Sequence, residues 1–318
     1  MDCYTSLQDK ALHFATCKTV NTIAEFETMI DELKSMKKAK ELRTVFRGLP
    51  EAKFKLFTSL QREWLISGLS ARFANPVDYI NLMLDDLKLP SNDLKRYLGS
   101  MGVHPNDWLL LAFLQHYGAP SPLLDFTKDY IPALYFMCKG LKPTDSDKDI
   151  ENYASIVGYN TVQVCDGCTQ KLGTTAFELY TAQQPADSEN FIKVELSFAN
   201  IMKNRDIEII SVDDGKTRIK KTKQKTILEF PVGNLNMIKQ EGEFVCNVNP
   251  HTPLEDLMVN TTGRRNSRLM FCYNIHKSLY EYILDKHLHG SMDFMTDYLF
   301  PSEYKIAEIA HKNALRKP

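Results

Sequence analysis

The chain has 318 residues, of which 43% are hydrophobic and 25% charged, with a formal net charge of −1 and a pI near 6.7. This composition excludes a largely disordered chain, and the balanced charge argues against a dedicated nucleic-acid or membrane-surface protein. No apolar run reaches the roughly 18 residues needed to span a bilayer, and residues 1–6 lack a secretory pattern, so we expect a cytosolic protein. Seven cysteines, an odd number, favour free thiols over a disulfide framework.

Helices dominate the elements predicted in the first half of the chain. Thr22 and Glu25 have capping-box spacing ahead of an apolar stripe, which predicts a helix over residues 23–36. Residues 42–47 follow as a strand rich in β-formers. Residues 57–100 are predicted to be helical, with interruptions at prolines.

A polar segment then lies between two apolar helices predicted at residues 108–114 and 131–137. Gly118 ends the first helix, and a short extended piece precedes the second. The segment carries four chemically capable side chains, namely Gln115, His116, Asp125 and Thr127. Because Asp125 stands between Leu124 and Phe126, the sequence predicts a buried carboxylate that needs a basic partner, either Arg47 or His116.

Strands dominate after residue 154. Runs of β-branched and aromatic residues predict four strands, at 155–159, 191–196, 207–212 and 226–232. The triplet Asp213-Asp214-Gly215 is typical of a hairpin turn. The whole pattern predicts an α+β fold with a central, mostly antiparallel sheet. Its parts are a helical N-terminal half over about 20–140, a strand-rich region over 154–250 and C-terminal helices over 270–312.

Several side chains could carry chemistry, and each has a structural alternative. Arg47 and Arg62 could bind a phosphate or carboxylate, or could form ion pairs within the protein. His116 could act as a general base, or could cap the end of its helix, and Thr127 could orient it or a ligand. Glu243, in a Glu-x-Glu pair with Glu241, could serve as an acid or base, or could belong to the solvated face of an edge strand.

Three further features favour ordinary structural roles. The lysine-rich run over residues 216–225 could contact the phosphates of a nucleic acid, but a solvated edge strand protected by lysines fits it better. Cys165 and Cys168 have metal-site spacing without a second pair of ligands, so we expect a turn with two thiols and no metal. His287 and His289 have no carboxylate partner nearby in the sequence and are expected at the surface.

The order of the motifs resembles that of the FRG domain family, which is named for its Phe-Arg-Gly triplet. The matching pieces, in chain order, are Phe46-Arg47-Gly48, residues 56–62, residues 116–136, Gln240-Glu241-Gly242-Glu243-Phe244 and Leu299-Phe300-Pro301. The resemblance implies one FRG-type domain over residues 1–318. It also implies a bacterial or phage-associated protein, for which a toxin or defence role is one option.

A weaker resemblance in motif order is to the Arg-Ser-Glu class of ADP-ribosyltransferases. It implies NAD or another nucleotide as the ligand, with Arg47 on the dinucleotide and Glu243 or Asp125 stabilising a ribosyl cation. Asp125-Phe126-Thr127 stands where that family has Ser-Thr-Ser. On this hypothesis the catalytic residues are Asp125, Glu243 and His116, and the ligand-binding residues are Arg47, Arg62, Gln115, Thr127 and Gln240. The alternative is a non-catalytic recognition module that binds a protein or nucleic-acid partner.

Overall fold

A computed structural model describes residues 3–39, 44–89, 91–100, 107–116, 118–141, 146–160, 207–213, 218–222, 225–231, 242–260 and 267–299. Its α-helices are α1 (Leu7–Ala11), α2 (Ile23–Lys38), α3 (Ser59–Ile66), α4 (Pro76–Lys88), α5 (Asp93–Ser100), α6 (Asp107–His116), α7 (Tyr130–Lys139), α12 (Leu254–Leu257), α13 (Tyr280–His287) and α14 (Met292–Leu299). Its short 3-10 helices are η1 (Leu69–Ala71), η2 (Asp149–Asn152) and η3 (Lys277–Leu279). Its strands are β1 (Thr16–Val20), β2 (Thr44–Leu49), β3 (Leu123–Thr127), β4 (Tyr153–Asn160), β5 (Ile207–Asp213), β6 (Arg218–Thr222), β7 (Lys225–Pro231), β8 (Gly242–Asn247), β9 (Val259–Asn260), β10 (Ser267–Arg268) and β11 (Met270–His276).

The helices begin where the sequence supplies caps. The predicted capping box at Thr22 and Glu25 opens α2, with Glu25 N donating to Thr22 Oγ1 at 3.3 Å and Thr22 N donating to Glu25 Oε2 at 3.1 Å. Thr58 caps α3 in the same way, and Asn75 caps α4, whose first residue is Pro76.

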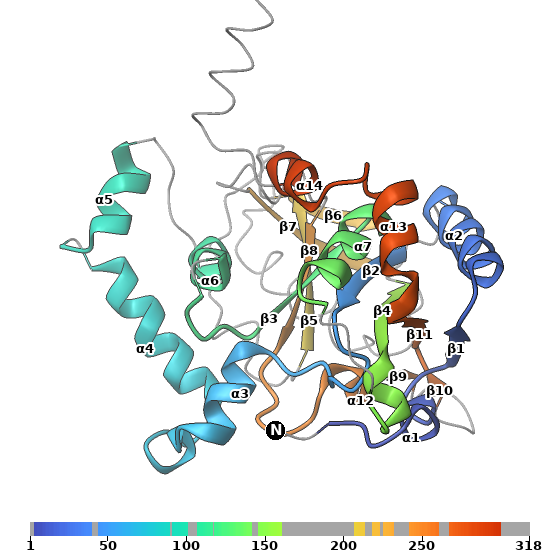
Figure 1. The fold of residues 1–318 in the computed structure, drawn as a ribbon. Coiled ribbons are helices and arrows are strands. Elements are labelled where there is room, and N and C mark those ends of the chain that lie inside the picture. Colours follow the sequence, from blue (N-terminus) through green and yellow to red (C-terminus); the bar gives the residue numbers. More distant parts are fainter. Residues whose placement is uncertain are drawn as a thin grey trace, which may run out of the picture.

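Nine of the described strands form one sheet in the order β1-β11-β4-β2-β3-β8-β5-β7-β6. Most neighbours are antiparallel, and β1 with β11 and β5 with β7 are the parallel pairs among the described strands. The predicted α+β class with a mostly antiparallel sheet is therefore confirmed. Figure 1 shows α3, α4, α5 and α6 on one side of the view, near β3, and α2 and α13 on the other, near β1.

Helices cover one face of the sheet in two groups. Phe46 and Ile156 pack under α2, α7, α13 and α14, while Leu123 and Phe244 pack under α3, α4 and α6. The other face of the sheet, which includes Val45 and its neighbours on β3 and β4, packs against the N-terminal segment and α12. Three apolar cores thus surround the central strands β2 and β3.

Gly48 brings α7 into direct contact with β2. A Cβ atom placed at Gly48 would lie 1.9 Å from the backbone oxygen of Ala133 and 2.6 Å from the backbone nitrogen of Met137. Only glycine permits this approach. Phe46, two residues earlier on the same face of β2, is fully buried beneath α7, whereas Arg47 between them belongs to the opposite face.

The structure corrects two predicted elements. Residues 270–276 form β11 rather than the start of the C-terminal helices, because their aromatic and apolar side chains pack on both faces of the sheet. The turn predicted at Asp213-Asp214-Gly215 does not join two neighbouring strands of a hairpin. β7 lies between β5 and β6, and Asp214 and Gly215 themselves lie outside the described residues.

Other predictions have mixed outcomes. β6 lies at the edge of the sheet, as expected for the lysine-rich run. The strand predicted at 191–196 and the pair Cys165 and Cys168 lie outside the described residues. Among the helices that the structure describes, none is long and apolar enough to cross a membrane.

Candidate functional site

The guanidinium of Arg47 lies where β2 and β3 separate. β2 pairs with β4 along its whole length, but it pairs with β3 at one position, Phe46 with Thr127. Among the described residues the register of β2 with β3 does not extend beyond that pair, and Arg47 Nη1 donates to the backbone oxygen of Asp125 at 2.6 Å. The arginine therefore replaces part of the missing ladder between the two strands.

The carboxylate of Asp125 stands beside this guanidinium but does not close a tight ion pair with it. Arg47 Nη1 is 3.8 Å from Asp125 Oδ2, and the same oxygen accepts a hydrogen bond from Gln115 Nε2 of α6 at 2.9 Å. The predicted burial of Asp125 is wrong, since its side chain is 50% exposed. Leu124 and Phe126 point into the core on one face of β3, and the pleat turns Asp125 to the other face.

Arg47 is a partly desolvated cation, and few interactions with the protein compensate for the loss of its hydration. Its side chain is 24% exposed, and its Nε is buried without a hydrogen-bond partner among the described residues. Burial lowers the pKa of Arg47, the charge of Asp125 raises it, and the nearby positive charge of Arg62 lowers it further. Desolvation also lowers the pKa of Arg62, although that residue is exposed as a whole.

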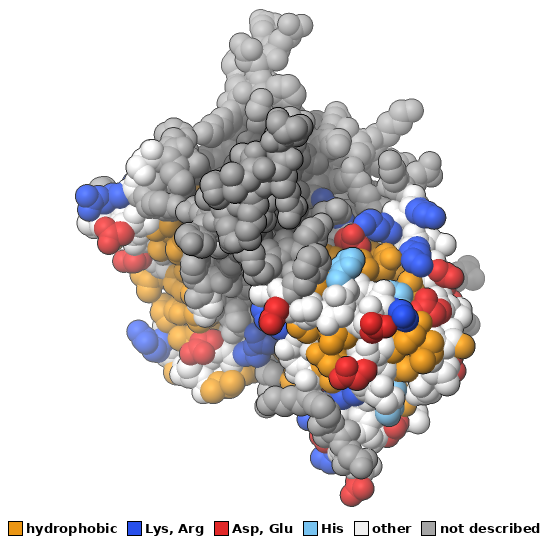
Figure 2. Space-filling model, turned by 45° about the horizontal axis from the view of Figure 1, so that its top comes forward, with side chains coloured by type: hydrophobic (Ala, Val, Ile, Leu, Met, Phe, Trp, Pro, Cys, Tyr) orange, Lys and Arg blue, Asp and Glu red, His pale blue; other side chains and the backbone are white. Residues whose placement is uncertain are grey.

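The described surface carries charges of both signs. Figure 2 shows basic and acidic side chains interspersed over the described part of one face. Two neighbouring arginines with one carboxylate between α3, α6 and the central strands make a small excess of positive charge. Such an arrangement can attract an anion, because each guanidinium presents several N–H donors in a fork.

Glu243 lies on β8, the neighbour of β3 on the side away from β2, and is buried. It pairs with Phe126 in the sheet, is 3% exposed, and accepts a hydrogen bond from the hydroxyl of Tyr159 at 2.9 Å. The Tyr159 ring in turn packs edge-on against Phe126, with centroids 5.1 Å apart. β8 is an interior strand, so the alternative of a solvated edge does not hold for Glu243.

The remaining predicted site residues divide into two groups. The hydroxyl of Thr127 is buried and bonds Asp129, donating to its backbone oxygen and accepting from its backbone nitrogen, both at 3.1 Å. That geometry stabilises the turn into α7. His116 ends α6 with its side chain outside the described atoms, and Gln240 lies outside the described residues.

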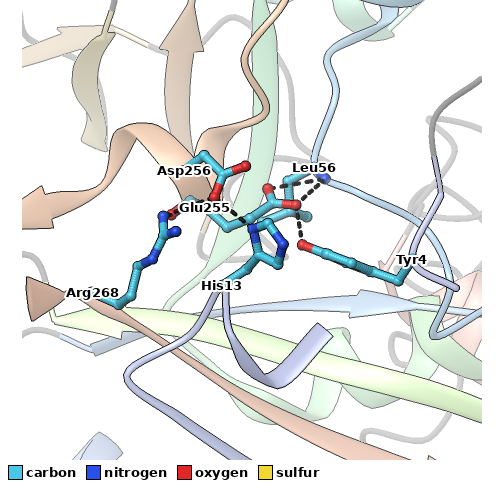
Figure 3. Close-up of polar contacts among 6 residues, drawn as sticks. All are labelled: Tyr4, His13, Leu56, Glu255, Asp256 and Arg268. Atoms are coloured by element: carbon cyan, nitrogen blue, oxygen red, sulfur yellow. Dashed lines mark hydrogen bonds and ion pairs between the residues drawn. The ribbon is translucent and has the colours of Figure 1, made fainter. Parts of the chain in front are cut away.

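A second polar cluster, drawn in Figure 3, joins the N-terminal segment to α12. Glu255 is fully buried and accepts hydrogen bonds from the Tyr4 hydroxyl and from the backbone nitrogen of Leu56, the latter at 3.1 and 3.3 Å. Asp256 beside it accepts from Arg268 Nη1 at 2.8 Å and lies 2.6 Å from His13 Nδ1. These contacts tie four distant segments together.

Burial raises the pKa of Glu255 above its usual range, against the lowering effect of its hydrogen bonds. Burial and the same carboxylate raise the pKa of Tyr4. This cluster is not predicted from the sequence, where its one local signal is a glutamate between Leu254 and Leu257. Nor does the sequence predict the partner of His287, whose Nε2 lies 2.8 Å from Glu27 Oε1 on α2.

A comparison with protein families gives the chain an assignment. The family model for the FRG domain matches residues 42–146. This part of the chain is similar to the FRG domain. No curated protein and no solved structure shows a match to the chain.

The FRG match covers about a third of the chain and includes the triplet Phe46-Arg47-Gly48. The whole arginine cluster, defined as Arg47, Arg62, Gln115 and Asp125, falls inside it. Glu243 and the motif at Leu299-Phe300-Pro301 lie outside the match, although β8 pairs directly with β3, which lies inside it. In the FRG triplet, Phe46 and Gly48 serve the packing of α7, which leaves Arg47 as the member open to a ligand.

Proposed function

We propose that the arginine cluster binds a phosphorylated ligand, with a nucleotide such as NAD as the first candidate. One observation carries the proposal. Arg47 is largely desolvated, yet its hydrogen bonds to described residues leave its buried Nε without a partner. Desolvated guanidinium groups with free donors bind phosphate oxygens strongly, often through two parallel hydrogen bonds.

The other members of the cluster suit the rest of a nucleotide. Arg62 adds a second positive charge near Arg47, which favours a diphosphate over a single carboxylate. The half-exposed Asp125 carboxylate, oriented by Gln115, can accept hydrogen bonds from ribose hydroxyls.

In an ADP-ribosyl transfer, Asp125 is the favoured group to stabilise the ribosyl cation. A catalytic carboxylate has to reach the reacting atoms, and Asp125 is half exposed whereas Glu243 is 3% exposed. Glu243 then holds Tyr159 and β3 in place rather than contacting the ligand. This reverses the order of the two candidates that motif resemblance alone suggests.

Binding is tested by a thermal-shift screen of the full chain with NAD, ATP and RNA. We expect a nucleotide to raise the Tm of the unmodified protein, and Arg47→Ala to remove that rise. Arg96→Ala is the matched control, because Arg96 is an exposed helical arginine paired with Asp93 at 3.6 Å. Absence of a shift with any nucleotide would contradict the proposal.

Catalysis is tested by measuring release of nicotinamide from NAD. We expect Asp125→Asn to lower the rate about 100-fold, the size typical of a lost electrostatic contact to the transition state. NAD binding should persist in that variant. A folded Glu243→Gln variant should keep most of the nicotinamide-release activity. Equal losses of rate in the two variants would mean that Glu243 also acts on the reacting atoms.

The alternative function is a non-catalytic recognition module. The observation in its favour is the 2.6 Å bond from Arg47 to the Asp125 carbonyl, which joins β3 to β2 where the ladder ends. On this account Arg47→Ala lowers the Tm in the absence of ligand, and nucleotides change nothing in either protein.

A further inference from the structure

Two cysteines face each other at one end of the sheet. The parallel strands β1 and β11 lie side by side, with Cys17 directly opposite Cys272 (Figure 1). Opposite residues of neighbouring strands have Cα atoms about 5 Å apart, which is within the range that a disulfide bridges. Both thiols are free; Cys17 is half-buried at the outer strand and Cys272 is 1% exposed.

A buried lysine lies next to this pair. Lys10 of α1 is 0% exposed, and its Nζ donates to the backbone oxygen of Ala52 at 2.9 Å and to Ser155 Oγ at 2.7 Å. The rings of Tyr4 and Phe14 lie 5.8 and 5.9 Å from the same nitrogen. Among the described residues no carboxylate stands within ion-pair distance of Lys10. A buried ammonium group without a counter-ion is costly, so its surroundings favour an anion.

A chain of hydrogen bonds connects the lysine to Cys17. Ser155 Oγ donates to Asn274 Oδ1 at 2.9 Å, and the thiol of Cys272 lies 3.5 Å from that oxygen. The bond from Ser155 fixes the amide of Asn274 so that its Nδ2 donates to Cys17 Sγ at 3.2 Å. The sulfur of Cys17 therefore faces a donor, as a thiolate requires.

The two thiols have opposite acidities. A hydrogen bond from the Cys272 thiol, the charge of Lys10 and the bond from Asn274 lower the pKa of Cys17 to about 7, against the effect of burial. Burial is the main cause that raises the pKa of Cys272. At neutral pH the accessible sulfur is thus the nucleophile and the buried sulfur keeps its proton.

We propose that Cys17 and Cys272 form a redox modification site, in which Cys17 reduces a peroxide and Cys272 resolves the product to a disulfide. The Cys17 thiolate attacks one peroxide oxygen, the O–O bond breaks, and the hydroxide that leaves takes up a proton. The sulfur of Cys272 then attacks the sulfenic sulfur of Cys17. The S–S bond forms, the S–O bond breaks, and the departing hydroxide leaves as water with the Cys272 proton. Two thiols lose two electrons, and hydrogen peroxide becomes two molecules of water.

The first experiment treats the full chain with one equivalent of hydrogen peroxide and maps its peptides by mass spectrometry. We expect a dithiothreitol-reversible link between the peptides of Cys17 and Cys272. The Cys272→Ser variant should stop at a sulfenic acid on Cys17 that dimedone traps. Peroxide treatment that leaves Cys17 unmodified in both proteins would overturn the proposal.

A second experiment tests the role of Lys10 as a positioning residue. The rate of iodoacetamide labelling of Cys17 should rise with a midpoint near pH 7 and exceed that of Cys3, which is also half-buried. Lys10→Met and Ser155→Ala should each move the midpoint upward, toward the value of about 8.5 for an ordinary thiol. The second variant removes only a hydroxyl, so it covers the case in which Lys10→Met fails to fold. A midpoint already at the ordinary value in the unmodified chain would contradict the mechanism.

Discussion

The Arg47 guanidinium has five N–H donors, and its surroundings engage them incompletely. One donor holds the Asp125 carbonyl, the Asp125 carboxylate stays at 3.8 Å, and Nε is buried without a partner among the described residues. Because Gln115 holds the carboxylate, Asp125 does not swing in to close the ion pair. The proposed ligand would supply the acceptors that the described residues do not.

Glu255 provides a prediction about pH at the scale of one residue. Its pKa is raised in the folded protein, so its contribution to stability is fully present below the unfolded pKa of about 4.3 and is lost as pH rises through the folded pKa. Glu255→Gln mimics the protonated form. We therefore expect the variant to gain free energy of unfolding relative to the unmodified chain as pH rises from 4 to 8, by about 1.4 kcal/mol for each unit by which the pKa is raised.

Urea unfolding of both proteins across that pH range measures this difference. Glu25→Gln is the matched control: it should show no gain between pH 5 and 8, and the difference from the unmodified chain should change only as pH falls below about 4.3. The backbone hydrogen bonds from Asn21 and Thr22 lower the pKa of Glu25, so its stabilising effect is present above the unfolded pKa and is lost as pH falls. Parallel pH profiles for the unmodified chain and Glu255→Gln would show that the buried carboxyl titrates normally.

At the scale of elements, the contact between β2 and α7 explains why Gly follows Arg in the triplet. The α7 backbone fills the space that a side chain at residue 48 would need. The same contact fixes β2, and with it the position of Arg47 relative to β3. Packing of one helix therefore sets the geometry of the candidate site.

Gly48→Ala tests that contact. The added methyl group would overlap the backbone oxygen of Ala133, so we expect a loss of about 3 kcal/mol or more in the free energy of unfolding. Chemical denaturation measures the loss. Because the clash is with the backbone, adding Ala133→Gly should not restore stability. An unchanged free energy of unfolding in Gly48→Ala would mean that α7 can shift away from β2 without loss of stability.

Local signals in the sequence predicted elements better than they predicted partners. The capping box at Thr22 and the apolar runs around the 115–127 segment placed their helices correctly, because caps and periodicity act within a few residues. The turn signal at Asp213-Asp214-Gly215 did not predict which strands are neighbours, because β7 pairs with both β5 and β6 and lies between them. Asp125 was misplaced for a related reason, since the pleat of one strand decides its face and flanking residues do not.

At the scale of the whole molecule, the sheet joins segments that the sequence keeps far apart. β1 pairs with β11, and β4 lies between β11 and β2, so the order of strands is set by contacts over hundreds of residues. No local pattern encodes such pairings, and the same holds for Cys17 with Cys272 and for Tyr4 with Glu255. The arginine cluster was predictable in part because three of its four members fall within motifs of the FRG resemblance.

The arginine cluster sits at the junction of the three apolar cores, where β2 and β3 part. The buried neighbours Phe46, Leu124 and Phe126 fix the backbone of β2 and β3, and with it the positions from which Arg47 and Asp125 extend. A preorganised site of this kind spends little of its binding free energy on ordering side chains. On the proposed function, the arginine cluster binds a phosphorylated ligand through the planar guanidinium of Arg47.

This binding is tested by isothermal titration calorimetry of NAD and of ATP with the unmodified chain and with Arg47→Lys. Lysine keeps the charge but loses the planar fork, and a charged hydrogen bond contributes about 1.5 to 3 kcal/mol. We predict that at least one of the two nucleotides binds, and that Arg47→Lys weakens its Kd about 10- to 100-fold while the Tm without ligand stays the same. Equal affinities in the two proteins, or no binding of either nucleotide, would contradict the account.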